Sequence, residues 1–371
     1  MTGIDLVNGV VGAVFGMVFA VLFQQPLQNA WFRIRRRSAT AVRSVTYRDD
    51  GVPHSMWSTF SIGPLHTSAL VVEGDGEQAI APESVRVHVL DGEVALPEEM
   101  APWRAEIAAE QEQAEATGTR VRVWNGPRYA VEGLEISRTA LEEHPDVRLR
   151  LRPTDYFTFL AAQQLDRRLP DGSTPRGRYL DPDRPLDAPA FLQCSFGVNV
   201  AVVTADHLLV VSRRSDQVRS GPGLWGSSVN EGLSRHIDSA GRHAPDLHDV
   251  ARRGMREELS VQPHEYSLTL LAFALDVERR QWSAHFTAHL SGLTGDGLRS
   301  RISHGVADRW EHQSIDHVPF RPADVVGYLL RPDRVRRWAP LTPALFHLAL
   351  VHTHGRGAVE RAEAQVVRRL R

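Results

Sequence analysis

The sequence predicts an α+β protein preceded by one transmembrane helix. Segments in which apolar and polar residues alternate are typical of strands, and the clearest are Cys194–Thr204 and Gln281–Leu290. Between them, apolar residues of the stretch Asp246–Val261 recur three and four positions apart, which is the period of a helix. Near the N-terminus, Leu6–Phe23 is an uncharged run of 18 residues. Strands, helices and an apolar span therefore all occur in one chain.

Composition limits the classes of function. The chain has 371 residues, enough for two domains and an appendage, and its formal net charge is −2. No overall basic field attracts nucleic acid, so direct nucleic-acid binding is not expected. The single cysteine, Cys194, excludes an intrachain disulfide framework. Because it lies in an apolar strand pattern, we expect a buried structural thiol and not a nucleophile.

The N-terminal run predicts a membrane anchor. Leu6–Phe23 is long enough to span a bilayer and is too long for a typical signal-peptide core. The basic residues that follow it are Arg33, Arg35, Arg36 and Arg37. This bias predicts a single-pass cell-membrane protein with residues 1–37 as anchor and basic juxtamembrane segment, and with the bulk of the chain in the cytoplasm. A buried N-terminal core helix is the alternative.

Small residues recur on one side of this run. Gly12 and Gly16 form a Gly-xxx-Gly pair, and Gly9 and Ala20 extend it. Small residues at this spacing allow two helices to approach closely in lipid, which predicts a homodimer through Gly12 and Gly16. The ordinary frequency of glycine in membrane helices explains the pattern equally well.

Residues 38–190 read as an α+β accessory region without a recognisable chemical motif. The alternating segments that predict strands are Ala69–Glu73, Ser84–Leu90, Arg120–Trp124, Tyr129–Ile136 and Val147–Leu151. Helices are predicted over Met100–Ala116 and Asp155–Arg168. Pro170–Pro189 is dense in Pro, Asp, Gly and Arg, which is typical of a long loop or linker.

A helix with paired acids forms the centre of the remaining chain. Asp246 follows Pro245 and is a candidate N-cap for a helix that ends near Leu259. Arg253 and Glu257 are four residues apart, so they are neighbours on the helix surface and are expected to form an ion pair. Glu258 is then left for a cation. A solvated, salt-bridged helix face is the alternative explanation of this charge pattern.

The same residues resemble the conserved box of the Nudix hydrolases. Arg253 matches the arginine of the box, Met255 and Val261 match its aliphatic positions, and Glu257 and Glu258 match its acidic pair. The residues that resemble the strand and glycine-rich loop leading into the box run from Gly223 to Gly232. This resemblance implies a Nudix-like α/β/α sandwich with a mixed sheet over residues 191–320. From Arg321 onward the pattern is helical and rich in arginine, which predicts a C-terminal helical segment, 321–371.

The box departs from the family pattern at three places. Gly254 stands where the family has its first glutamate, Ser260 replaces the last glycine, and residues 233–244 form an insertion. The first departure removes one carboxylate from the helix face that carries metal ligands in the family. Glu231, Asp246 and Glu311 are the candidates to replace it, and we expect Glu231 to do so because it ends the glycine-rich loop that faces the helix.

The resemblance implies roles for seven residues. Glu231, Glu257 and Glu258 are the expected catalytic acids, with Glu257 and Glu258 as ligands of Mg²⁺ or Mn²⁺, which prefer carboxylate oxygens. The expected substrate contacts are Arg213, Arg214, Trp225 and Arg253. For Arg213 and Arg214, an ordinary charged strand end is the competing explanation.

Three functions follow from this set. The first is Mg²⁺-dependent hydrolysis of a nucleoside-diphosphate-linked substrate by a membrane-anchored protein. The second is a catalytically weak or inactive nucleotide-binding sensor or effector, similar to the divergent Nudix-like domains of bacterial signalling and defence systems. The third is a scaffold that uses the fold only for contacts. Convergence of Glu231, Glu257 and Glu258 would favour a metal site, whereas a pocket filled by Trp225 would favour the scaffold.

Overall fold

A computed structural model describes residues 58–118, 125–138, 144–215, 221–305 and 312–370. The chain divides into two compact units, 1–54 and 55–371, and the described residues belong to the second unit. Among them, no helix is both long and apolar enough to cross a membrane. The predicted span Leu6–Phe23 and the pair Gly12/Gly16 lie outside the described residues.

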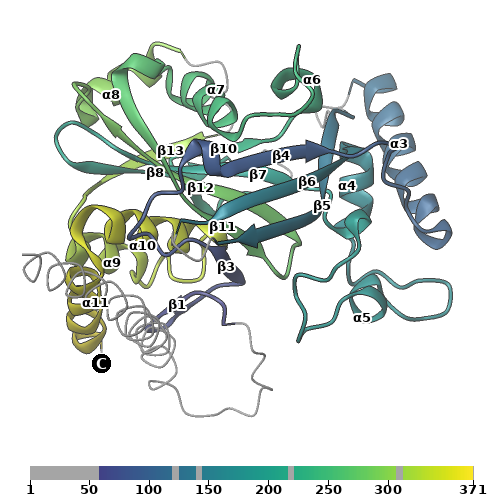
Figure 1. Ribbon diagram of the computed structural model, residues 1–371, viewed down its shortest axis with the longest axis horizontal. Helices are drawn as coiled ribbons and strands as arrows, with labels where there is room; N and C mark the ends of the chain where they lie inside the picture. The colour runs from purple at the N-terminus through teal and green to yellow at the C-terminus, as the bar shows by residue number, and fades with distance from the viewer. Residues whose placement is uncertain (1–57, 119–124, 139–143, 216–220, 306–311, 371) are drawn as a thin grey trace, which may run out of the picture. The chain divides into compact units, whose positions relative to one another are not determined.

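A mixed sheet forms the core of the second unit (Figure 1). Its strands follow the order β13 (His312–Pro319), β8 (Leu208–Arg214), β7 (Phe196–Val203), β12 (Gln281–Leu290), β11 (Tyr266–Asp276) and β3 (Ala69–Glu73), with β10 (Val229–Gly232) paired to β7 and β9 (Trp225–Gly226) paired to β8. β7 and β12 are parallel, and the other described pairs of this sheet are antiparallel. The predicted mixed sheet is therefore confirmed, and the strand predicted over Gln281–Leu290 is β12.

The accessory region contributes a second, smaller sheet. Its strands are β4 (Val85–Val89), β6 (Asp146–Asp155) and β5 (Pro127–Ser137), in that order, while β1 (Ser61–Ile62) and β2 (Leu65–His66) form a separate hairpin. The strand predictions for 84–90, 129–136 and 147–151 are confirmed. Arg120–Trp124 lies outside the described residues.

Helices cover both faces of the large sheet, and others belong to the accessory region. They are α3 (Ala101–Ala116), α4 (Tyr156–Ala162), α5 (Pro175–Tyr179), α6 (Arg235–Asp238), α7 (Leu247–Leu259), α8 (Gly295–Ser303), α9 (Pro322–Leu329), α10 (Leu341–His354) and α11 (Arg356–Arg369). The 3-10 turns are Pro82–Ser84, Glu98–Met100, Ala190–Leu192 and Pro263–Glu265. The helical character predicted from Arg321 onward is confirmed.

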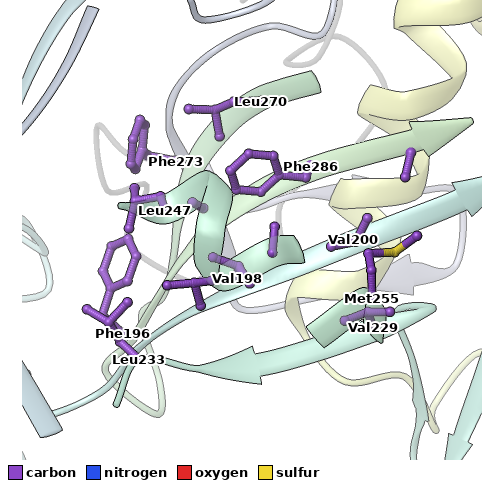
Figure 2. Packing of buried hydrophobic residues seen from close by; sticks show 14 of the residues in the cluster. Phe196, Val198, Val200, Val229, Leu233, Leu247, Met255, Leu270, Phe273 and Phe286 are labelled. Atoms are coloured by element: carbon purple, nitrogen blue, oxygen red, sulfur yellow. The ribbon is translucent and has the colours of Figure 1, made fainter. Parts of the chain in front are cut away.

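Strand β7 shows how the sequence separates two cores. Val198, Val200 and Val202 pack in a cluster with α7, whereas Ala201 and Val203 pack in a second cluster with α10. Successive side chains of a strand point to opposite faces, so one apolar strand supplies both clusters. Figure 2 shows the first cluster, in which Met255 of α7 packs beside Val229 and the valines of β7. The small sheet contributes to this first cluster, including Tyr129, Val131 and Leu149.

The box helix α7 begins and ends as local chemistry requires. The Asp246 side chain accepts hydrogen bonds from the backbone N–H groups of His248 and Asp249, which confirms the predicted N-cap. The helix ends at Ser260, whose φ of 55° lies in the left-handed region. A glycine adopts this conformation without strain, whereas serine costs about 1 kcal/mol. The departure at position 260 therefore preserves the end of the helix.

The helix predicted over Asp155–Arg168 is shorter than expected. α4 ends at Ala162, after which the chain turns and buries Leu165 and Leu169 in a third cluster with Trp103 of α3. Continuing the helix would change the placement of these two leucines, so tertiary packing overrides the local pattern. The loop predicted over Pro170–Pro189 contains the short helix α5.

Candidate functional site

The helix α7 approaches strand β10 closely at Gly254. A Cβ atom placed on Gly254 would lie 2.7 Å from Cγ1 of Val229 and 3.0 Å from Cβ of Glu231. A larger residue here would require β10 to move away from the helix. Position 254, where the Nudix box has a glutamate, therefore has no room for a larger side chain. Glu231 from β10 packs directly over Gly254.

The guanidinium of Arg253 is the electrostatic centre of this contact. Arg253 is 6% exposed, and its Nη1 lies 2.9 Å from Glu231 Oε1 and 3.3 Å from Glu257 Oε2. Its Nε and Nη2 donate to the two carboxylate oxygens of Asp238 at 2.9 and 3.0 Å. Nη2 also donates to the carbonyl of Gly232 at 3.0 Å. The fork of arginine matches such bidentate pairing, so one cation holds three carboxylates together.

These contacts shift the protonation equilibria of both partners. Burial raises the pKa of Glu231 to about 8, and the negative charges of Glu258 and Glu257 add to the rise while Arg253 opposes it. Burial acts to lower the pKa of Arg253, but the hydrogen bond to Asp238 and the surrounding carboxylates raise it overall. Of the two partners, Arg253 carries its charge at every ordinary pH, whereas Glu231 titrates.

The acidic pair of the box has two different environments. Glu258 is 2% exposed, and its Oε1 accepts a hydrogen bond from the backbone N–H of Asn230 at 3.0 Å. Glu257 is more exposed, and besides Arg253 it lies 3.7 Å from Nη2 of Arg256. The expected Arg253–Glu257 ion pair is confirmed. Glu258, in contrast, joins α7 to β10 through a backbone donor.

The expected metal site needs several carboxylate oxygens directed at one cation. Within the part of the chain that the structure describes, no group of three or more His, Cys, Asp or Glu side chains is arranged to hold a metal ion. Glu231 and Glu257 both face Arg253, and a guanidinium repels a cation placed beside it. The residues in this arrangement do not fit a bound Mg²⁺ or Mn²⁺ ion.

Of the other expected substrate contacts, Arg213 and Trp225 have partners outside the acid cluster. Nε of Arg213 donates to the carbonyl of Gly223 at 3.4 Å, and Arg214 ends β8. Trp225, 9% exposed, belongs to the second cluster on the α10 side, where the Arg334 guanidinium lies 4.0 Å from its ring centroid. The structure thus brings Glu231, Arg253, Glu257 and Glu258 together but leaves Trp225 in the other core.

One residue of the cluster, Asp238, was not predicted from the sequence. Asp238 lies in the insertion 233–244, on the short helix α6, and binds Arg253 through both oxygens. Nothing in the spacing of the box pairs it with an arginine 15 residues later. Glu311, another candidate to replace the missing acid of the box, lies outside the described residues. Cys194 is buried as predicted, and burial raises the pKa of its thiol to about 12.

Comparison with known proteins gives a distant, partial likeness. No family model matches the chain, and no curated protein matches it. Among solved structures, DR0079 from Deinococcus radiodurans is similar at 14% identity and a TM-score of 0.30, over 41% of this chain and 81% of its own. A MutT NUDIX hydrolase from Burkholderia pseudomallei is similar at 14% identity and a TM-score of 0.28, over 42% of this chain and 96% of its own. Both likenesses cover less than half of this chain.

Proposed function

We propose that this protein binds a nucleotide-type small molecule without hydrolysing it, and acts as a sensor or effector. The observation that carries the proposal is the Arg253 guanidinium, which occupies the space among Glu231, Asp238 and Glu257. A divalent cation would have to displace this arginine from a buried site. Separating a buried, hydrogen-bonded ion pair costs about 3–5 kcal/mol, so the arrangement opposes a catalytic metal.

Hydrolysis with Mg²⁺ or Mn²⁺ is the second candidate, and one observation favours it. Glu231 packs over Gly254, the position of the missing box acid, and its pKa of about 8 lies close to neutrality. A carboxyl group with such a pKa is suited to accept or donate a proton at neutral pH. The scaffold is the third candidate, and the burial of Trp225 against Trp338 and Tyr328 is the contact that agrees with it.

A turnover assay separates the first two candidates. The full-length protein is incubated with nucleoside diphosphate derivatives and Mg²⁺ or Mn²⁺, and the products are separated by chromatography. We expect the wild-type protein to release no more product than the Glu258→Gln variant. Calorimetric titration in EDTA measures binding of the same compounds, and we expect it to persist. Metal-dependent turnover that Glu258→Gln abolishes would establish the hydrolase instead.

The membrane anchor remains part of the proposal and rests on the sequence alone. The uncharged run Leu6–Phe23 and the arginines after it support a single-pass cell-membrane protein with a cytoplasmic ligand-binding unit. Replacing Gly12 and Gly16 with leucine is expected to weaken self-association in a membrane reporter assay. An unchanged reporter signal would remove the homodimer from the proposal.

A further inference from the structure

The C-terminal part of the chain is basic, although the chain as a whole is not. Residues 331–370 carry eight arginines and three acids, whereas the full sequence has 43 basic and 45 acidic residues. Three of the eight arginines form ion pairs, namely Arg331, Arg334 and Arg356. Positive charge is therefore concentrated in this part of the fold, and only some of it is neutralised by neighbouring acids.

The other five arginines are exposed and have no ion pair among the residues that the structure describes. We call them the basic surface: Arg336 and Arg337 between α9 and α10, and Arg361, Arg368 and Arg369 on α11. Two acids lie near them, because Glu360 precedes Arg361 and Glu278 lines a cavity together with Arg336. Five arginines against two acids leave a net positive charge on the basic surface.

The basic surface borders the hairpin β1–β2, which is where the described chain begins, at Ser58. A Cβ atom on Gly63, at the turn of this hairpin, would lie 2.8 Å from Cγ2 of Val367, so the C-terminal end of α11 packs on the hairpin. Arg336 lines a cavity together with His66 of β2. Arginines from α11 and from the α9–α10 connection therefore lie near the point where the N-terminal part of the chain joins this unit.

One large apolar side chain is exposed at the same end of α11. Leu370 is 51% exposed, directly after Arg369. An apolar side chain beside arginines suits the interface of a bilayer, where the apolar group enters the headgroup layer and the cations pair with lipid phosphates. A nucleic-acid backbone offers the same negative charge but no such layer, so the combination favours lipid.

The proposed anchor keeps this surface within reach of lipid. Between Arg37 and Ser58 the chain spans at most roughly 70 Å when fully extended. A tether of this kind makes docking an intramolecular step, so a weak attraction is sufficient. Each arginine close to an anionic bilayer strengthens binding roughly fivefold.

We propose that the basic surface, together with Leu370, docks on the headgroups of an anionic lipid bilayer. The planar guanidinium groups pair with lipid phosphates, and Leu370 enters the headgroup layer. Docking holds the ligand-binding unit against the membrane in one orientation. This inference rests on the membrane anchor of the proposed function.

A dye on α11 reports docking of the full-length protein. Cys194 is buried, so a thiol introduced by Gln365→Cys, at an exposed position of α11 between Arg361 and Arg368, is labelled selectively. The protein is reconstituted into vesicles that contain a lipid with a spin-labelled headgroup, which quenches a nearby dye. The vesicles are phosphatidylcholine alone or equal parts of phosphatidylcholine and phosphatidylglycerol. We expect strong quenching only in the anionic vesicles, and its loss in about 1 M salt, where the Debye length is about 3 Å.

Charge variants identify the residues responsible. The variant with Arg361→Gln, Arg368→Gln and Arg369→Gln is expected to dock about 100-fold more weakly, so quenching falls to the level in neutral vesicles. The matched control has the same change at three exposed arginines outside the basic surface, and is expected to retain the quenching: Arg86, Arg148 and Arg184. Thermal unfolding shows that each variant is folded.

A second dye position tests whether docking is confined to this face. Glu110→Cys places the dye at an exposed position of α3, which lies at the opposite end of the second unit from α11 (Figure 1). We expect no quenching of this dye in the anionic vesicles. Equal quenching at positions 110 and 365 would show that the unit has no preferred face toward the bilayer, which contradicts the inference.

The outcomes separate the basic surface from the anchor, because flotation with neutral vesicles tests the anchor alone. If the protein floats with both kinds of vesicle but quenching at position 365 does not depend on anionic lipid, the basic surface is wrong and the anchor stands. If it floats only with anionic vesicles, and the three arginine changes abolish this, the anchor is wrong and the basic surface stands. If an oligonucleotide changes the dye's fluorescence and anionic vesicles do not, the partner is nucleic acid and the inference fails.

Discussion

Two buried arginines of this protein have opposite electrostatic surroundings. Arg253 on α7 is 6% exposed and pairs with Glu231, Asp238 and Glu257. Arg280, in the turn between β11 and β12, is 2% exposed, and its Nη2 donates to the amide oxygen of Gln193 at 3.3 Å. The carboxylates raise the pKa of Arg253, whereas burial lowers the pKa of Arg280 to about 10.

The different surroundings of Arg253 and Arg280 indicate how each region can interact with a charged ligand. In the box region, the Arg253 guanidinium already pairs with the acids, so a second cation would be repelled there. The turn region holds a buried arginine without an ion pair among the described residues. There Asp276 only partly opposes the effect of burial on the pKa of Arg280, whereas three carboxylates contact Arg253 directly.

The largest expected effect comes from removing the arginine of the box. Arg253→Met leaves the largely buried acids Glu231 and Asp238, and the partly exposed Glu257, beside an apolar side chain. We expect the free energy of unfolding to fall by about 3–5 kcal/mol. Urea denaturation of the full-length protein measures this loss. Arg256→Met, on the same helix but half-exposed, is the control and is expected to cost within about 0.5 kcal/mol. Equal losses in the two variants would contradict the central role of Arg253.

A smaller effect is expected from Glu231, and it depends on pH. The pKa of its carboxyl group is about 8 in the folded protein, against an ordinary value of 4.5. Between these two values the folded state binds more protons than the unfolded state, so the stability that this group contributes is lost as pH rises through about 8. Glu231→Gln cannot titrate. Its stability relative to the wild type is therefore expected to rise across this interval, by an amount on the order of 1–3 kcal/mol.

Chemical denaturation at a series of pH values measures that change. The direction follows from the raised pKa alone, whereas Arg253, which favours the charged carboxylate, reduces its size. Parallel stability curves for the wild type and Glu231→Gln would show that folding does not raise the pKa of Glu231.

The smallest effect is expected at Arg280. Arg280→Met replaces a buried cation that has no ion pair by an apolar side chain of similar length, and such exchanges are often nearly neutral. We expect a change in the free energy of unfolding within about 1 kcal/mol. Urea denaturation beside Arg253→Met makes the comparison direct. A loss at Arg280 as large as the loss at Arg253 would remove the contrast between the two regions.

The sequence predicted those parts of the site that depend on local spacing. The N-cap Asp246 and the ion pair between Arg253 and Glu257 both follow from helix geometry, and both are present. The expectation that Glu231 reaches the place of the missing acid agrees with its contact over Gly254. In contrast, Asp238 belongs to the insertion, and no periodicity relates it to α7.

Side-chain placement that depends on the packing of distant elements could not be predicted. The strand pairing β7–β8–β9 places Trp225 on the α10 face, and α10 begins more than 100 residues later in the chain. A cavity of about 580 Å³ likewise lies among α3, α4 and the β11–β12 turn, which are far apart in the sequence. Only the folded arrangement brings these elements together.

The central claim is that Arg253, and not a metal ion, balances the acids of the box. The most direct test is the thermal unfolding midpoint of the full-length wild-type protein, measured in EDTA and then with increasing Mg²⁺ or Mn²⁺. A ligand that binds only the folded state raises this midpoint. We predict that neither cation changes it. A concentration-dependent rise that disappears in Glu258→Gln would contradict the claim and restore the metal site.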